Sequence, residues 1–184
     1  MKKSLIKLFA LVLLAGSAVS CKKAYDDNNL APLAPSLADI PVTVTNYNVF
    51  ERFPVFFATA PSGPFTITFQ IPADKGKIKE ISRVATGNNG LRDVQTGAPT
   101  LLYNYNSTTS SIAPIPGNGS NTISFTSDLS AYSAYRTRVG PGTATVNPVV
   151  STNPQAPTQI EYFFLITLEN GTTIVPERVR VRVM

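Results

Sequence analysis

A strict alternation of apolar and polar residues between positions 65 and 71 is the feature that most constrains the fold. Every second residue of Phe65–Ile71 is phenylalanine or isoleucine, and threonine or glutamine fills the positions between them. Successive side chains of a strand point to opposite faces of its sheet. The segment is therefore predicted to be an antiparallel strand with one face in a core and the other in water.

The C-terminal part of the chain predicts a hairpin. Ile160–Leu168 is apolar at nearly every position, and Thr172–Val183 returns as a second strand. Between them lies Asn170-Gly171, the preferred pair for a two-residue type I′ turn. The alternating valines of the second strand are expected to face the core, and the arginines between them to face water.

The register of this hairpin contains a misfit. Counting inward from the turn pairs Ile166 with Val175 but places the apolar Phe164 opposite the charged Glu177. A bulge adds one residue to one strand and resets the pairing beyond it. We therefore expect a bulge near Pro176.

The rest of the mature chain predicts more strands and few helices. Shorter strands are expected at 41–45, 54–58, 78–85 and 121–126, and 131–139 is expected to be either a strand or a short irregular helix. The whole chain has 15 prolines and 11 glycines, and all but Gly16 lie in the mature part, where they supply turns; no segment there shows a sustained helical period. The prediction is an all-β protein, with an immunoglobulin-like antiparallel β-sandwich of about seven strands over residues 41–184.

The first twenty residues have the layout of a secretory signal. Lysines at positions 2, 3 and 7 accompany an apolar run centred on Leu8–Leu14, which gives way at Gly16-Ser17. A membrane-spanning helix needs about 20 mostly apolar residues, so permanent spanning is disfavoured. We interpret residues 1–20 as a signal peptide.

The end of this signal, Ala18-Val19-Ser20-Cys21, resembles the lipobox of bacterial lipoproteins, with alanine where leucine is common. The resemblance implies a diacylglycerol on Cys21 and an acylated amine, which would anchor the chain without a spanning helix. The alternative is a plain secretory signal followed by a free thiol. Residues 21–40 are polar and then proline-bearing, which predicts a flexible tether, with or without an export tag.

The lipobox, the strand at Phe65–Ile71 and the hairpin at Tyr162–Val183 together resemble small immunoglobulin-like lipoproteins of the Bacteroidetes type, found near polysaccharide-uptake systems of the starch-utilisation type. The resemblance implies a lipid-anchored protein on the periplasmic or cell-surface face of the outer membrane. Its expected role is non-catalytic binding or scaffolding beside an outer-membrane protein or glycan partner. The alternative role is that of a self-associating structural or adhesive surface protein.

The residue inventory argues against several kinds of chemistry. The chain has no histidine and one cysteine, which removes histidine-based nucleophile systems and the common zinc sites. Its acidic residues show no repeated spacing, so we predict neither an enzyme nor a metal or cofactor site. Without the three signal lysines, 13 basic residues face 11 acidic ones, a net charge of +2. These basic residues are scattered, so nucleic acid is not an expected partner.

Two groups of residues are candidate contacts for a ligand or partner. The tyrosines lie in loop-rich segments and either form a recognition surface or cover the core. The arginines of the last strand either bind an acidic glycan or partner, or deter aggregation at a sheet edge. The candidates are Tyr103, Tyr105, Tyr132 and Tyr135, and Arg178, Arg180 and Arg182.

Overall fold

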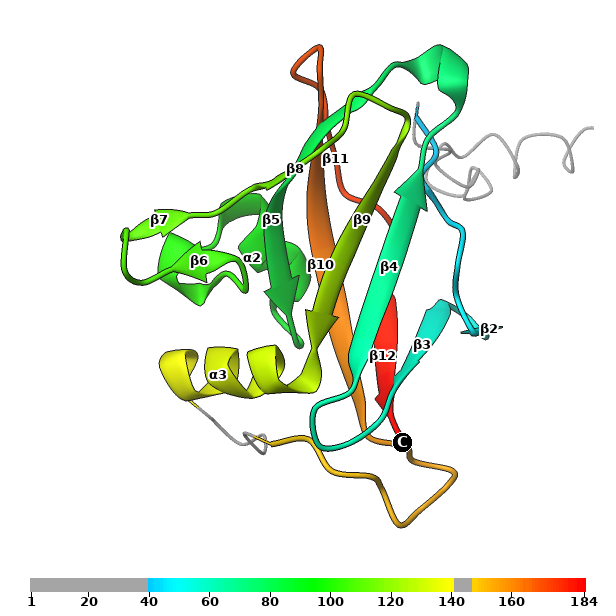
Figure 1. Ribbon diagram of the computed structural model, residues 1–184, viewed down its shortest axis with the longest axis vertical. Helices are drawn as coiled ribbons and strands as arrows, with labels where there is room; N and C mark the ends of the chain where they lie inside the picture. Colours follow the sequence, from blue (N-terminus) through cyan, green and yellow to red (C-terminus); the bar gives the residue numbers. More distant parts are fainter. Residues whose placement is uncertain (1–39, 141–146) are drawn as a thin grey trace, which may run out of the picture. The chain divides into compact units, whose positions relative to one another are not determined.

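Two β-sheets pack face to face in the computed structural model, which describes residues 40–140 and 147–184 (Figure 1). The β-sandwich predicted from the sequence is confirmed. The signal peptide at 1–20, the lipidation site at Cys21 and almost all of the tether at 21–40 lie outside the described residues.

The smaller sheet has the strand order β1-β4-β9, with both pairs antiparallel. Its strands are β1 (Thr43–Val44), β4 (Pro64–Gln70) and β9 (Thr122–Asp128). The predicted alternation of β4 is confirmed, because Phe65, Ile67 and Phe69 are at most 5% exposed. The ring of Phe69 meets Phe164 of the other sheet at a centroid distance of 4.8 Å, so this face closes the core.

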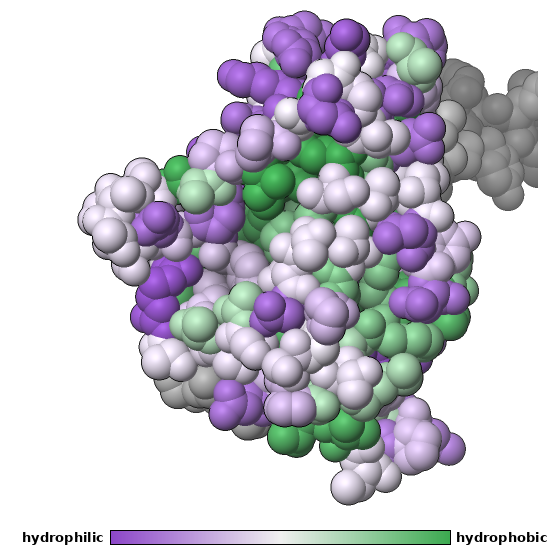
Figure 2. Space-filling model, in the orientation of Figure 1, coloured by the Kyte–Doolittle hydropathy of each residue, from purple (hydrophilic) through white to green (hydrophobic). Residues whose placement is uncertain are grey.

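The outer face of the smaller sheet is covered with hydroxyl groups. Across the β4–β9 pair, Thr66 bonds to Thr126 and Thr68 to Ser124, each at 3.0 Å between the oxygens. Figure 2 shows this face, where pale residues of intermediate hydropathy predominate over β4 and β9. These hydroxyls partly satisfy one another, and the face carries little charge.

The larger sheet has the order β2-β3-β12-β10-β5-β8, with β11 pairing to β10. All its pairs are antiparallel except β3 with β12, which run parallel. Its strands are β2 (Val49–Phe50), β3 (Pro54–Ala58), β5 (Ile78–Thr86), β8 (Ile115–Pro116), β10 (Gln159–Leu168), β11 (Thr173–Ile174) and β12 (Val179–Val183).

The central strand β10 is covered on both faces, which explains its nearly continuous apolar sequence. Tyr162, Phe164 and Ile166 are fully buried in the core between the sheets. Phe163, on the opposite face, packs with Val94 in a second apolar cluster. A strand buried on both sides loses the polar half of the usual alternation.

Four short helices and a small ribbon complete the described structure: η1 (Ala73–Lys75), α2 (Gly90–Thr96), η2 (Pro99–Leu101), α3 (Leu129–Val139), and β6 (Tyr105–Asn106) paired with β7 (Ser111–Ile112). The ambiguous segment at 131–139 is helical. Asp128 caps α3 by accepting a bond from the Ala131 amide at 2.7 Å. Helix α2 was not predicted. No helix in the described part of the chain is long and apolar enough to cross a bilayer.

The turn of the C-terminal hairpin differs from the prediction. A type I′ turn requires positive φ at both central residues, but here only Gly171 has one, at 85°. The Gly171 amide donates to Leu168 O and the Leu168 amide to Thr172 O, both at 2.9 Å, which makes a three-residue loop. The Asn170 side chain instead accepts from the Thr172 amide at 3.0 Å. The predicted Ile166–Val175 pairing is therefore wrong.

The expected bulge beyond this turn is confirmed. Ile166 pairs with Ile174, and Tyr162 pairs with Val179. Four steps along β10 thus correspond to five steps along the returning chain, so one extra residue lies between β11 and β12. This irregular segment contains Pro176, which cannot donate to a ladder.

Candidate functional site

Three of the four candidate tyrosines come together where α3, which carries Tyr132 and Tyr135, packs against Tyr103. The Tyr103 ring lies 5.2 Å from Tyr135 and 5.5 Å from Tyr162, and the Tyr135 ring lies 6.2 Å from Tyr132. The Tyr103 hydroxyl bonds to Ser127 at 2.6 Å, and Tyr135 donates to Leu101 O at 3.2 Å. These contacts are those of side chains that cover a core.

Burial sets the protonation of this cluster. It raises the pKa of Tyr103 and Tyr132 above 10.0, and a hydrogen bond from Ser127 offsets part of the rise at Tyr103. Burial raises the pKa of Tyr162 furthest, with an added contribution from Tyr103. The phenols of Tyr103, Tyr132 and Tyr162 therefore stay neutral at physiological pH.

Tyr105 joins this cluster through a cation. The Arg138 guanidinium lies 5.3 Å from the Tyr105 ring centre and 5.4 Å from that of Tyr135. It also donates to Leu102 O at 2.6 Å and to Thr100 O. Arg138 thus ties α3 to the loop around η2.

The three candidate arginines, Arg178 just before β12 and Arg180 and Arg182 within it, are already paired with carboxylates. Arg178 and Arg180 donate to opposite oxygens of Glu161, at 3.0 and 3.1 Å, and Arg182 donates to Glu51 at 2.9 Å. Strand β12 lies between β10 and β3, so the interpretation of these arginines as protection for a sheet edge is wrong. An acidic ligand would have to compete with Glu161 and Glu51.

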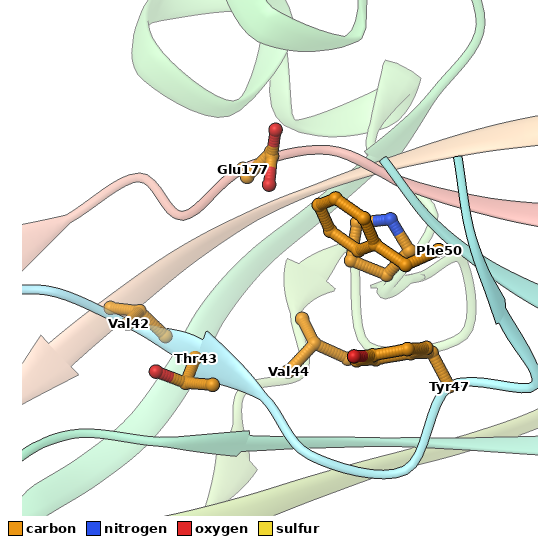
Figure 3. Close-up of a pocket in the computed structure, with 7 residues that line it drawn as sticks. Val42, Thr43, Val44, Tyr47, Phe50 and Glu177 are labelled. Atoms are coloured by element: carbon orange, nitrogen blue, oxygen red, sulfur yellow. The ribbon is translucent and has the colours of Figure 1, made fainter. Parts of the chain in front are cut away.

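The sheet edge is occupied by β2, and a pocket of about 270 Å³ opens beside it. It is lined by Val42, Thr43, Val44, Tyr47, Phe50, Pro54 and Glu177. Figure 3 shows side chains from β1, from the β1–β2 connection and β2, and from the segment between β11 and β12 around one space. We call this site the β1–β2 pocket.

Two asparagines hold Tyr47 in place at this pocket. Asn46 donates to Thr66 O and accepts from the Thr68 amide, both at 2.8 Å, which fixes it to the smaller sheet. Asn48 accepts from the Phe57 amide at 3.0 Å, which fixes it to the larger sheet. Asn46 is thus bound to one sheet and Asn48 to the other, which holds the backbone of Tyr47 where the two sheets meet. The Tyr47 residue itself is 44% exposed.

Phe50 completes an exposed aromatic pair. It is 54% exposed on β2, and its ring centre lies 5.6 Å from that of Tyr47 at an interplanar angle of 55°. Val49 between them in sequence is also exposed, at 39%. Large apolar side chains grouped in this way on a surface commonly mark an interaction site.

Glu177 is the one charged residue among those that line the β1–β2 pocket. It lies in the irregular segment with the extra residue, between β11 and β12. Its side chain makes no hydrogen bond or ion pair with another described residue, in contrast to Glu161 and Glu51. The pocket therefore combines aromatic rings with an unpaired carboxylate.

A second pocket, of about 420 Å³, lies near the start of α3. It is lined by Ala60, Pro61, Ser62, Ser130, Ser133, Asn147, Pro148 and Val149, with no charged group among them. Nor does any group of three or more acidic or cysteine side chains gather around a possible metal position in residues 40–140 and 147–184. The β1–β2 pocket offers the more specific chemistry.

Sequence reasoning missed this site. Its one local signal was a run of three aromatic residues, Tyr47, Phe50 and Phe53, in an otherwise mostly polar stretch between two predicted strands. The contribution of Glu177 had no local signal, since it comes from the far end of the chain. The candidates that were named from the sequence, the tyrosines and arginines, mostly have partners within the fold.

Comparisons with known proteins identify no relative. No protein family and no curated protein matches the sequence. A solved structure with some likeness is that of a mutant of the SrpA adhesin from Streptococcus sanguinis, with 15% identity and a TM-score of 0.36. The alignment covers 79% of this chain and 58% of that one. A likeness at this level carries no inference about function.

Proposed function

We propose that this protein is a non-catalytic binding module of the cell envelope, which holds a partner at the β1–β2 pocket. The observation that carries the proposal is the exposed Tyr47–Phe50 pair, which lines one pocket together with the unpaired Glu177 carboxylate. Interface contacts that dominate binding are enriched in aromatic residues, and the asparagines on either side of Tyr47 hold its backbone in place before a partner arrives.

The second part of the proposal is the anchor. Lipid on Cys21, as the lipobox resemblance implies, confines the module to the outer membrane, on its periplasmic or cell-surface face. Confinement raises the effective concentration of the module beside membrane partners. The partner that we propose is a component of an outer-membrane assembly, such as a glycan-uptake system.

The anchor and the pocket are tested separately. Cys21→Ser is expected to move the mature protein from the membrane fraction to the soluble fraction, measured by fractionation of the envelope. A protein that stays firmly bound after this change would remove the lipid anchor from the proposal.

The pocket is tested by photo-crosslinking in the native envelope. Benzoylphenylalanine in place of Phe50 is expected to capture one envelope component. The matched control is the same replacement of Leu91, which is 48% exposed on α2 and is expected to capture none. Equal labelling from both positions would overturn the role of the pocket.

A second candidate function is self-association. Strand β2 is a sheet edge with Val49 and Phe50 exposed, and an exposed edge is a template for pairing with another chain. In this case the Phe50 crosslink joins two copies of the same protein, and sedimentation of the Cys21→Ser protein shows a concentration-dependent dimer. A strict monomer at all concentrations excludes this function.

A further inference from the structure

We propose that the β1–β2 pocket receives an arginine or lysine side chain from a partner protein. This inference rests on the proposed binding function and names the chemistry of the partner. The charge of the pocket, its aromatic rings and its size all favour such a ligand.

The charge of the pocket favours a cation. Glu177 is the one ionisable group in its lining apart from the Tyr47 phenol, and it has no partner among the described residues. A guanidinium or ammonium group at this carboxylate gains a charge-assisted hydrogen bond. An acidic partner would instead meet a like charge, which disfavours it.

The aromatic rings favour the same ligand. The face of an aromatic ring attracts a cation within about 6 Å of its centre. The chain itself combines cations, an aromatic ring and a carboxylate at Phe53. The guanidinium carbons of Arg178 and Arg180 lie 4.0 and 4.9 Å from the Phe53 ring centre. Both guanidinium groups also pair with the Glu161 carboxylate. The lining of the β1–β2 pocket likewise includes aromatic side chains and a carboxylate, and this carboxylate, of Glu177, is solvent-exposed and unpaired within the described structure.

The size of the pocket indicates a single side chain. Its volume of about 270 Å³ falls below the roughly 300–1,000 Å³ of pockets that enclose whole drug-sized ligands. The partly exposed Val42 and the exposed Tyr47 and Phe50 in its lining offer apolar surface to the methylene stem of an arginine or lysine. The pocket thus suits the end of a long cationic side chain presented by another protein.

The test is a titration of the full-length protein with Nα-acetyl-arginine amide, followed by NMR of the Tyr47 and Phe50 ring signals. Nα-acetyl-citrulline amide is the neutral control of the same shape. We expect saturable shifts with arginine and at least about threefold weaker binding of citrulline, the size expected for one exposed ion pair. Equal binding of the two compounds would overturn the inference.

Variants assign the effect to the pocket. Glu177→Gln is expected to weaken arginine binding about threefold to fivefold, and Phe50→Leu to weaken it by a similar factor. The matched control is Glu169→Gln, which removes the same charge at the hairpin tip outside the pocket lining and is expected to leave binding unchanged. Unchanged binding in Glu177→Gln, with an unchanged melting temperature, would refute the inference.

The outcomes of this test and of the crosslinking experiment are distinguishable. A partner captured at Phe50 without any preference for arginine over citrulline would leave the binding function standing and remove the cationic ligand. A preference for arginine without a captured partner would support the pocket chemistry and count against the envelope function. Capture of a neutral glycan or a second copy of the chain, with no arginine or lysine at the crosslink, would also overturn the inference.

Discussion

The Tyr162 hydroxyl provides a sharp test of whether the tyrosine cluster is core. Tyr162 has no exposed surface, and its ring lies within 5.5 Å of the ring centres of Phe65 and Tyr103. Its hydroxyl makes no hydrogen bond of normal geometry with a described residue, although Tyr103 is near enough to affect its pKa. The perturbation that we consider is Tyr162→Phe, which removes this oxygen and keeps the ring.

The expected effect is a gain in stability. A buried polar group without a partner costs about 1–3 kcal/mol, and the substitution keeps the apolar area of the ring in the core. We expect Tyr162→Phe to raise the free energy of unfolding by about 1 kcal/mol, or the melting temperature by about 2–4 °C. Tyr103→Phe, which loses the 2.6 Å bond to Ser127, is expected to lower the free energy of unfolding by about 1 kcal/mol.

The assay is urea unfolding of the full-length protein and both variants, followed by circular dichroism. A shift of the midpoint with an unchanged slope reports a change in stability alone. If Tyr162→Phe destabilises the protein as much as Tyr103→Phe does, the hydroxyl of Tyr162 has a stabilising partner, and the reasoning is refuted.

The same variant changes the response to alkaline pH. The pKa of Tyr162 is raised well above 10.0 in the folded protein, whereas a tyrosine in the unfolded chain titrates near 10. Above that pH the unfolded state loses a proton that the folded state keeps, so stability falls as the pH rises. Tyr162→Phe is expected to reduce this loss between about pH 10 and 12, and an unchanged loss would contradict it.

Three further predictions concern the scaffold, each measured as a change in the free energy of unfolding. Glu161→Gln is expected to lower the free energy of unfolding by about 1–2 kcal/mol, because Glu161, at 20% side-chain exposure, pairs with both Arg178 and Arg180. Arg178→Gln removes one of these pairs and is expected to lower it less; an equal loss from both variants would show that Glu161 does not stabilise both arginines. Gly90→Ala is expected to cost about 1–3 kcal/mol, because the new methyl group would overlap the Phe163 ring, and Phe163→Leu is expected to offset part of that cost. Gly171→Ala is expected to cost about 1–2 kcal/mol, since its φ of 85° disfavours any side chain, and a neutral result would show that the turn adapts.

Structural features that depend on one segment alone could be predicted from the sequence pattern of that segment. The alternation of Phe65–Ile71 determines which face of β4 enters the core, because the side-chain period of a strand depends on that strand alone. The extra residue near Pro176 was also expected, but from a register one residue out of step with the observed Ile166–Ile174 pairing. The sandwich class and most strand positions follow from such patterns.

Which strands lie next to each other in a sheet was decided by the tertiary structure. The arginine row on β12 has the same period at a sheet edge as in a sheet interior, so the sequence did not reveal that β3 pairs with β12 in parallel. The hairpin turn depended on which residue adopts a positive φ, and Gly171 alone does so. The short helix α2 was missed because seven residues contain too few turns to show a helical period.

The β1–β2 pocket is also a feature that the tertiary structure decided and no local sequence pattern predicted. The amino-acid order gives Asn46, Tyr47 and Asn48 as neighbours, but only the packed sheets fix each asparagine to a different sheet. Glu177 reaches the same place because two segments that lie far apart in the sequence meet there. A periodic pattern states which way a side chain points within its own strand, whereas a site requires side chains from several strands, and their meeting is decided by the packing of the whole core.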